Sequence, residues 1–330
     1  MKIRSVGYLG LGASDPLAWL RYGVDVMGMM PARAVPGESW GIPQSGMMPK
    51  SARSGIAEDG SIFLKLDERQ WRIAVHPDPG HGGLQYIGLE LDGPLELQAA
   101  VGELEAEGIE VRMGTAADAQ ARAVSGIAKL RDPSGNALEL FYGPTTDYLF
   151  QPTCPGVEFM AGSLGPGHLN LFVTQQPACF DFYTRVLGFR LTDYIRLGPE
   201  AKLQFLRCNR RHHSIAMLDM GGLKGLQHLM IEVRDIDSVG RILDRARQAG
   251  VQVTSSIGRH RNDGVLSFYM RTPSDFDIEI GCEGLLLDES WTTNEFCEGD
   301  VWGHEGIVDA VQKTGENMRI RQQASGTNER

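Results

Sequence analysis

Four segments of the chain share one pattern of apolar and polar positions. They read GYLGL, QYIGL, GHLNL and QHLMI, and they contain Tyr8, Tyr86, His168 and His228. Their apolar residues alternate as in a half-buried β-strand. Each segment precedes a helix-like stretch that ends in a glycine and an apolar residue, at Gly28, Gly108, Gly188 and Gly250. A glycine there suits the left-handed conformation that commonly follows the end of a helix.

The spacings sort these four units into two pairs. Gly28 follows Tyr8 by 20 residues and Gly188 follows His168 by 20, whereas the other two units each span 22. A repeat at fixed spacing indicates that one structural unit occurs several times. We therefore expect four similar modules, the first related to the third and the second to the fourth.

Later segments repeat in the same way. WRIAV at 71–75 resembles HSIAM at 213–217, and DPSGNALEL at 132–140 resembles TPSDFDIEI at 272–280. The pattern predicts an α+β protein with two similar domains. Each domain would hold two βαβββ modules that form a curled, barrel-like mixed sheet.

The repeat also predicts where the domains begin and end. We expect an N-terminal domain at 1–145, a C-terminal domain at 146–310 and a polar tail at 311–330. The link lies near 141–156, which contains three prolines. The first module is about 18 residues longer than the third, and the Gly- and Ser-rich residues 44–61 predict a surface loop there.

Composition narrows the possible partners. The chain is 42% hydrophobic and 22% charged, with a formal net charge of −10 and no run of Lys or Arg. These values are typical of an ordinary globular protein, and they disfavour a nucleic-acid or anionic-membrane partner. Five cysteines without CxxC spacing indicate neither a disulfide framework nor a zinc ribbon. With no apolar leader or membrane-spanning stretch in view, we expect a reducing, cytoplasmic location.

The two halves differ where chemistry is possible. The C-terminal half has His168, His228 and Glu279 at positions that match Tyr8, Tyr86 and Glu139 in the N-terminal half. Two imidazoles and one carboxylate can hold non-haem Fe(II) on one face and leave other positions open. A single strand histidine more often makes a hydrogen bond in the core. Equivalent repeat positions together with an aligned carboxylate favour a metal site in the second half only.

Longer motifs of the C-terminal half resemble a known family. They are GHLNLFV at 167–173, NRRHHSIAML at 209–218, LQHLMIEV at 226–233, GRHRNDGVLSFYMRTPSDFDIEIG at 258–281 and VWGH at 301–304. In this order they resemble type I extradiol dioxygenases of the vicinal oxygen chelate superfamily, especially the two-domain 2,3-dihydroxybiphenyl 1,2-dioxygenase group. The resemblance extends from GYLGLG at 7–12 to WGHEG at 302–306.

This resemblance implies a fold and a reaction. The fold would be the glyoxalase-like fold, with Fe(II), or occasionally Mn(II), bound by His168, His228 and Glu279. The reaction would be cleavage of the aromatic ring of a catechol next to the diol, with both atoms of O2 incorporated, in the breakdown of aromatic compounds. The implied partners are a catechol-type small molecule and O2, and family members are commonly homo-oligomers.

The resemblance also implies roles for residues around the metal. His213 matches the acid/base residue, and His260 and Tyr269 match residues that hydrogen-bond the bound catechol. The expected substrate-contacting residues are Phe205, Asn170, Asn262 and Asp263. Asn170 departs from the family pattern, because a small apolar residue is often found two positions after the first ligand. The long first module departs as well, and it bears on oligomer contacts rather than on chemistry.

Plainer interpretations of these residues remain open. From periodicity alone Tyr269 is a core strand residue, and His260 is an exposed loop residue in the polar stretch GRHRND. His212 and His213 would face opposite sides of a strand, so that one of them meets solvent or an interface. His76, His81 and His304 are expected to be structural or surface residues. Glu139 is expected to be either a vestige or a paired carboxylate rather than a second metal site.

Two other functions compete with ring cleavage. One is a vicinal oxygen chelate metalloenzyme of the glyoxalase or epimerase type, and the other is a non-catalytic protein that binds an aromatic compound. Fold alone does not choose among them, because this architecture hosts several chemistries. The sequence also leaves open whether the catechol is mono-, bi- or polycyclic, whether iron or manganese is bound, and how many subunits assemble.

Overall fold

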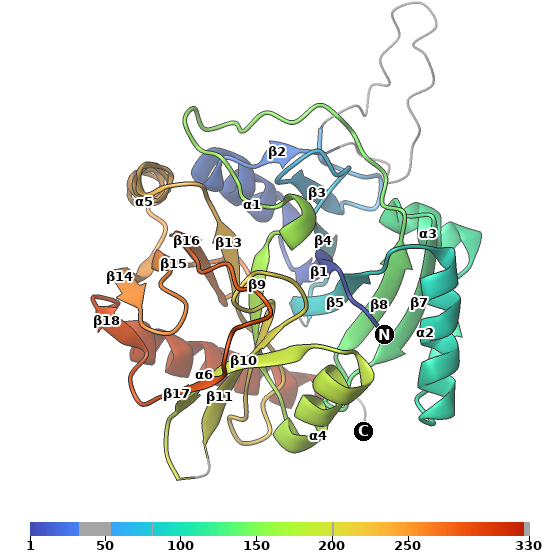
Figure 1. Ribbon diagram of the computed structural model, residues 1–330. Helices are drawn as coiled ribbons and strands as arrows, with labels where there is room; N and C mark the ends of the chain where they lie inside the picture. Colours follow the sequence, from blue (N-terminus) through green and yellow to red (C-terminus); the bar gives the residue numbers. More distant parts are fainter. Residues whose placement is uncertain (33–53, 81, 200, 327–330) are drawn as a thin grey trace, which may run out of the picture.

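The computed structural model describes residues 1–32, 54–80, 82–199 and 201–326 of the chain (Figure 1). Each of the four modules begins with a strand that the alternating pattern predicted. These strands are β1 (Ser5–Ala13), β5 (Gly83–Glu90), β9 (Gly167–Phe172) and β13 (Gly225–Glu232). Residues 44–53 of the predicted surface loop and His81 lie outside the described residues.

The helix that follows each first strand ends one or two residues before the predicted glycine. The helices are α1 (Pro16–Arg21) with the π-helical η1 (Tyr22–Met27), α2 (Pro94–Ala106), α4 (Gln176–Asp181) with the π-helical η3 (Phe182–Val186), and α5 (Ile236–Gln248). Gly28, Gly108, Gly188 and Gly250 all have positive φ, between 69° and 85°, which confirms the left-handed ends. Among the described residues, no helix has both the length and the apolar character needed to cross a bilayer.

Three further strands complete every module. They are β2 (Met30–Pro31), β3 (Ile62–Lys65) and β4 (Ile73–Pro77); β6 (Val111–Met113), β7 (Gly126–Arg131) and β8 (Ala137–Tyr142); β10 (Arg190–Arg196), β11 (Lys202–Arg207) and β12 (Ile215–Leu218); and β14 (Val253–His260), β15 (Leu266–Arg271) and β16 (Asp277–Cys282). The second module adds α3 (Ala116–Arg122), and η2 (Gly162–Leu164) precedes β9. The predicted α+β architecture of βαβββ modules is therefore confirmed.

The modules pair into two mixed sheets with related strand orders. The first sheet runs β2-β3-β4-β1-β5-β8-β7-β6, and the second runs β17-β10-β11-β12-β9-β13-β16-β15-β14-β18, with β17 (Asn294–Phe296) and β18 (Asp300–Trp302) at its edges. In each sheet the two first strands are antiparallel neighbours at the centre, and each first strand is parallel to the last strand of its own module. The sheets are curled but not closed.

An ion pair is conserved between the two halves. Arg69 pairs with Glu90 at 3.0 Å in the first half, and Arg211 pairs with Glu232 in the second. Both members of the second pair lie 142 residues after their counterparts. The internal repeat therefore extends from the strand pattern to individual side-chain contacts.

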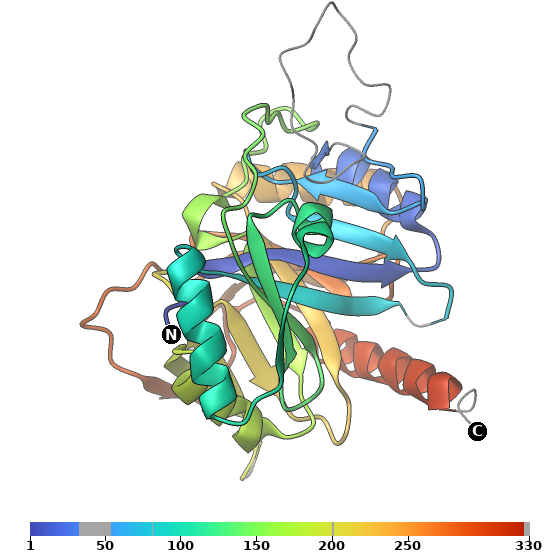
Figure 2. The same ribbon diagram turned by 90° about the vertical axis from the view of Figure 1, so that its right-hand side faces the viewer.

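One continuous hydrophobic core joins the two halves. It contains Leu9 and Leu11 of β1 together with Leu169 and Leu171 of β9, and it includes side chains of the intervening helices. The indole of Trp19 lies in this core, donates a hydrogen bond from Nε1 to Ser274 Oγ at 2.9 Å and lies against the ring of Phe276. Figure 2 shows α2 lying across β7 and β8 on the outside of the first sheet. Because α2 lies on the outside, it does not cover the curled inner face of the first sheet.

Residues 311–326 of the predicted polar tail belong to a helix. Helix α6 spans Ile307–Gly326 and crosses the end of the second sheet (Figure 1). Thr314 is fully buried and accepts a hydrogen bond from Arg271, and Met318 packs against the core side chains of that end. The buried residues of α6 recur at helical spacing, but most of the positions between them are polar. From the sequence alone, such a narrow apolar stripe resembles a solvent-exposed segment.

Trp19 allows a test of how strongly the halves support each other. Its side chain is 0% exposed, whereas Leu17 on the same helix is 45% exposed. We expect Trp19→Ala to lower the free energy of unfolding by about 3–5 kcal/mol, because it removes a large buried ring and leaves a cavity. Leu17→Ala should change it by no more than about 0.5 kcal/mol. Equilibrium urea denaturation of both variants measures the difference, and equal losses would contradict the assignment.

Candidate metal centre and active site

The inner faces of the two sheets are used differently. In the first sheet, aromatic side chains fill the curl, and they are Tyr8, Phe63, Trp71, Tyr86 and Phe141. A small pocket that borders Tyr8, Trp71 and Phe141 has a volume of about 10 Å³. In the second sheet the curl holds a cavity of about 400 Å³, within the range of ligand pockets, which is about 300–1,000 Å³. The second half therefore has room for a substrate.

Three adjacent strands of the second sheet each carry one residue of the predicted triad. His168 lies on β9, His228 on β13 and Glu279 on β16. The Nε2 atoms of the two histidines are 3.2 Å apart, and they lie 3.3 and 3.4 Å from Oε2 of Glu279. The three atoms form a nearly regular triangle on the wall of the cavity.

This triangle has the size that one metal ion requires. Nitrogen and oxygen ligands lie about 2.0–2.2 Å from a zinc ion, so two ligands at a right angle are about 3 Å apart. The observed spacings of 3.2–3.4 Å are close to that value. Two imidazoles and a carboxylate are also the donor set of many non-haem Fe(II) oxygenases. The residues present therefore fit a divalent ion.

The charge state of the triad supports the same conclusion. Both oxygens of Glu279 are buried, and neither accepts a well-aligned hydrogen bond from any residue that the structure describes. Burial alone raises the pKa of Glu279, but the imidazoles of His168, His228 and His260 outweigh it and hold that pKa well below its usual value. Burial lowers the pKa of His168, which favours the neutral form that binds metals. An ionised, buried carboxylate needs a compensating charge, and a cation supplies it.

A neighbouring amide fixes the orientation of one ligand. The Nδ1–H of His228 donates a hydrogen bond to Oε1 of Gln227 at 2.5 Å. A donor bond from one ring nitrogen leaves the lone pair of the other free for a metal. Nε2 of His228 is therefore unprotonated, and its lone pair is available at the triangle. Gln227 was not among the predicted site residues, although it directly precedes the ligand in the motif LQHLMIEV.

His213 lies beside the triad with its ring against that of His168. The two ring centroids are 3.8 Å apart, and the ring of Phe205 meets His213 edge-on at 4.8 Å. Burial, together with His168 and His212, holds the pKa of His213 well below its usual value. The Nδ1 atoms of His212 and His213 are 3.1 Å apart, so Nε2 of His213 is the nitrogen left for the cavity.

The expectation that His212 and His213 face opposite sides is wrong. Both are 2% exposed, and Nε2 of His212 contacts Asp193 at 2.7 Å. The reason is local: these residues precede β12, which begins at Ile215, and the backbone there is not an extended strand. The alternation of side chains therefore does not apply to them.

His260 and Tyr269 form the other flank of the triad. Nε2 of His260 is 2.8 Å from the hydroxyl of Tyr269 and 3.3 Å from Oε1 of Glu279. Burial lowers the pKa of His260, but the carboxylates of Asp300 and Glu279 outweigh it and raise that pKa well above its usual value. Burial, with Glu279, raises the pKa of Tyr269 well above its usual value, so the phenol stays protonated. Both side chains line the cavity. Tyr269 is at the same time a buried residue of strand β15, and His260 is the last residue of β14 rather than an exposed loop residue.

A carboxylate and a second histidine support His260 from behind. Oδ1 of Asp300 lies 2.8 Å from Nδ1 of His260 and 2.6 Å from Nδ1 of His304. The rings of the two histidines are 4.2 Å apart, and Nε2 of His304 reaches Ser267 Oγ at 3.1 Å. His304, which the sequence predicts to be a structural or surface residue, is buried. Asp300 was not among the predicted site residues, because its contact depends on the pairing of β14 with β18.

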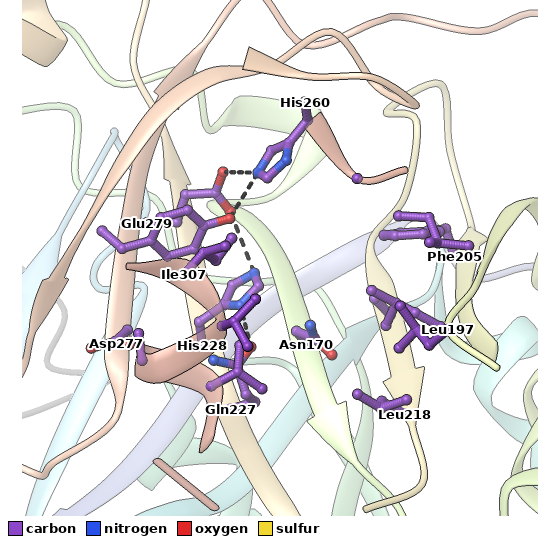
Figure 3. A pocket seen from close by; sticks show the side chains of 18 of the residues that line it. Asn170, Leu197, Phe205, Leu218, Gln227, His228, His260, Asp277, Glu279 and Ile307 are labelled. Carbon is purple, nitrogen blue, oxygen red and sulfur yellow. Dashed lines mark hydrogen bonds and ion pairs between the residues drawn. The ribbon is translucent and has the colours of Figure 1, made fainter. Parts of the chain in front are cut away.

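The remaining predicted residues also border the cavity. They are Phe205, Asn170, Asn262 and Asp263. Oδ1 of Asn170 is buried and has no hydrogen-bond partner among the described residues. Oδ2 of Asp263 is 3.8 Å from Nδ1 of His213. Figure 3 shows His260, Glu279 and His228 joined along one wall, with Leu197 and Phe205 across the open space. The structure thus brings all ten predicted site residues to one cavity.

The matching position in the first half has no such opening. Tyr8 donates a hydrogen bond from its hydroxyl to Oε2 of Glu139 at 2.7 Å, and Arg122 pairs with the same oxygen at 2.9 Å. The guanidinium of Arg122 also lies 3.8 Å from the centre of the Tyr86 ring. Glu139 is the paired carboxylate that was expected.

Comparison with known proteins places this site in a family. The sequence model of the Glyoxalase/Bleomycin resistance protein/Dioxygenase superfamily matches residues 165–280. An iron-dependent extradiol dioxygenase of Rhodococcus jostii is 38% identical over 319 residues, which cover 93% of this chain and 99% of that protein. A biphenyl-2,3-diol 1,2-dioxygenase of Paraburkholderia xenovorans is 34% identical over 316 residues, with 94% and 97% covered.

Solved structures agree with the sequence relatives. The crystal structure of a halotolerant catechol dioxygenase is 32% identical, covers 94% of this chain and 97% of that chain, and superposes with a TM-score of 0.83. A Mn(II)-bound glyoxalase from Novosphingobium aromaticivorans is 20% identical, covers 92% and 93%, and has a TM-score of 0.73, so it shares the fold alone. The chain belongs to the extradiol dioxygenase family, within the superfamily that also contains glyoxalases and bleomycin resistance proteins.

Proposed function

We propose that the protein is an Fe(II)-dependent extradiol dioxygenase. It would cleave the aromatic ring of a catechol next to the two hydroxyl groups and incorporate both atoms of O2, as part of the breakdown of aromatic compounds. The observation that carries this proposal is the triangle of two histidine nitrogens and one carboxylate oxygen, 3.2–3.4 Å on a side, on the wall of a substrate-sized cavity. The names of relatives support the substrate class, and they include a biphenyl-2,3-diol 1,2-dioxygenase and a 3-methylcatechol 2,3-dioxygenase.

His168, His228 and Glu279 would hold the metal. Their donor set suits Fe(II), and Mn(II) accepts the same donors. A ferrous ion held there would supply the redox chemistry through which an aromatic diol reacts with dioxygen. The protein would contribute the binding geometry, a largely apolar cavity and groups that move protons.

His213 is the proposed base. A catechol must lose a proton to bind a metal through its oxygens, and a neutral imidazole close to the triad can accept it. Low pKa keeps His213 neutral, and Nε2 is the nitrogen available on the cavity side because Nδ1 faces His212. The same nitrogen can return the proton later in the reaction. The ring stacked on His168 holds this base in place.

His260 and Tyr269 are the proposed donors on the opposite flank. A cationic imidazole and a protonated phenol can each donate a hydrogen bond to an oxygen that gains negative charge. Their mutual contact at 2.8 Å and the support of Asp300 fix both groups before substrate arrives. Phe205, Asn170, Asn262 and Asp263 would contact the substrate around them.

The competing functions fit the site less well. A glyoxalase- or epimerase-type reaction would use the same fold, but it gives no reason for His213 and His260 to flank the triad. A protein that only binds an aromatic compound gives no reason for a buried carboxylate between imidazoles. Both competing functions predict that the protein, supplied with Fe(II) and air, does not cleave a catechol.

The setting of the enzyme follows from the same proposal. We propose domains at 1–145 and 146–310, a homo-oligomeric assembly and a cytoplasmic location. The net charge of −10 argues against nucleic acid and anionic membranes as partners, and five free thiols are consistent with a reducing compartment.

The metal site can be tested with a control from the first half. We expect His228→Ala, purified and loaded with Fe(II) without oxygen, to lose most of its bound iron and to form no yellow ring-fission product from biphenyl-2,3-diol in air. Tyr86→Phe, at the equivalent position, should keep both properties at a cost in stability of about 0.5–1.5 kcal/mol for one hydrogen bond. Metal analysis and absorbance measure the two effects. Product formed at the wild-type rate by His228→Ala would exclude this metal site.

The role of His213 predicts a different result. His213→Phe should keep its iron, because the ring is not a ligand, while turnover falls by about 100-fold or more as the base is lost. Single-turnover kinetics on iron-analysed protein measure this. Loss of iron together with activity would instead make His213 a ligand or a structural residue.

A further inference from the structure

The cavity extends well beyond the metal triad. Along β9 the residues His168, Asn170 and Phe172 all line it, because alternate residues of a strand share one face. Each two-residue step advances about 6.6–6.8 Å, so Phe172 marks the far end of the cavity. The parallel neighbour β12 adds Ala216 beside Asn170 and Leu218 beside Phe172.

The far end differs in chemistry from the triad end. Phe172, Leu203, Leu218 and Met220 form one apolar cluster there. The histidines and carboxylates described above are concentrated around the triad. A ligand that fills the whole cavity must therefore have a polar diol at one end and apolar surface at the other.

Helix α6 closes this apolar end. Val311 packs into the cluster of Phe172 and Leu218, and Ile307 also lines the cavity. Two hydrogen bonds hold the helix in place: Arg271 donates to Thr314 Oγ1 of α6 at 2.9 Å, and Arg321 of α6 donates to the carbonyl of Ser274 at 3.0 Å. It is therefore a fixed wall of the site.

The volume exceeds the need of a single ring. A cavity of about 150 Å³ lined by apolar side chains binds benzene, and this cavity encloses about 400 Å³. A catechol placed with its hydroxyl groups at the triad leaves the space between Asn170 and α6 unfilled. Apolar surface on the substrate would gain free energy by filling it.

We propose that α6 is the specificity-determining wall of the site, and that it selects catechols carrying a bulky apolar group on the ring. Val311 is the residue that contacts the end of that group, with Phe172 and Leu218 on its other sides. This inference rests on the proposed ring-cleaving function, because that function places the diol at His168, His228 and Glu279.

The test uses two diols and one matched control. Biphenyl-2,3-diol and 3-methylcatechol differ in the bulk of their apolar group, and dissociation constants for both are measured with Fe(II)-loaded protein without oxygen. We expect the wild type to prefer the biphenyl diol by about tenfold or more. Val311→Trp should reduce that preference by about tenfold, because the indole occupies the far end. Ile320→Trp, on the exposed side of the same helix (63% exposed), should keep the wild-type preference.

The outcomes separate this inference from the function on which it rests. Equal affinity of the wild type for both diols, or equal weakening of both by Val311→Trp, would overturn the role of α6 while leaving ring cleavage intact. A wild type that binds Fe(II) and cleaves neither diol in air would instead refute the proposed function. If Val311→Trp does not fold, as judged by circular dichroism, Val311→Phe replaces it with the same expected direction.

Discussion

Both halves of this structure depend on the burial of a negatively charged carboxylate, whose charge neutral groups alone do not compensate. Each half holds one at the equivalent place on its inner sheet face: Glu139 is 3% exposed and Glu279 is 0% exposed. Burying a charge without compensation costs free energy that is large compared with the net stability of a domain. The first half meets this with the guanidinium of Arg122. The second half offers imidazoles, and a bound metal ion would be the cation that completes the balance. The same fold thus gives a closed structural site in one half and an open, proposed metal site in the other.

The difference between the halves is also one of volume. Tyr8 lies 4.9 Å from Trp71 and 4.6 Å from Phe141, ring centre to ring centre, and together they fill the first curl. The corresponding residues of the second half are His168, His213 and Gly281. Each replacement is smaller, and two of them add a nitrogen that can bind a metal or a proton. The same three residue differences therefore account for both the cavity and the nitrogen atoms that can bind a metal or a proton.

Much of this was predictable because it depends on local periodicity repeated along the chain. Alternation located the four central strands, and the repeat placed His168 and His228 at equivalent positions of neighbouring strands, so their convergence follows from topology. What could not be predicted depends on contacts distant in sequence. Asp300 reaches His260 only because β18 pairs with β14, and the apolar stripe of α6 is too thin to identify without the cavity that it covers. His212 was misplaced because alternation fails where the strand has not yet begun.

The two histidines that flank the proposed metal site have environments that shift their pKa values in opposite directions. His213 has imidazole neighbours, His168 and His212, so a positive charge there is opposed and its pKa falls. His260 lies between two carboxylates, Asp300 and Glu279, so a positive charge there is favoured and its pKa rises. Titratable groups whose surroundings move their pKa values apart mark the acid and the base of a site. A catechol between them would lose a proton toward His213 and meet positive charge at His260, so the direction of proton movement across the cavity follows from the charges placed behind each ring.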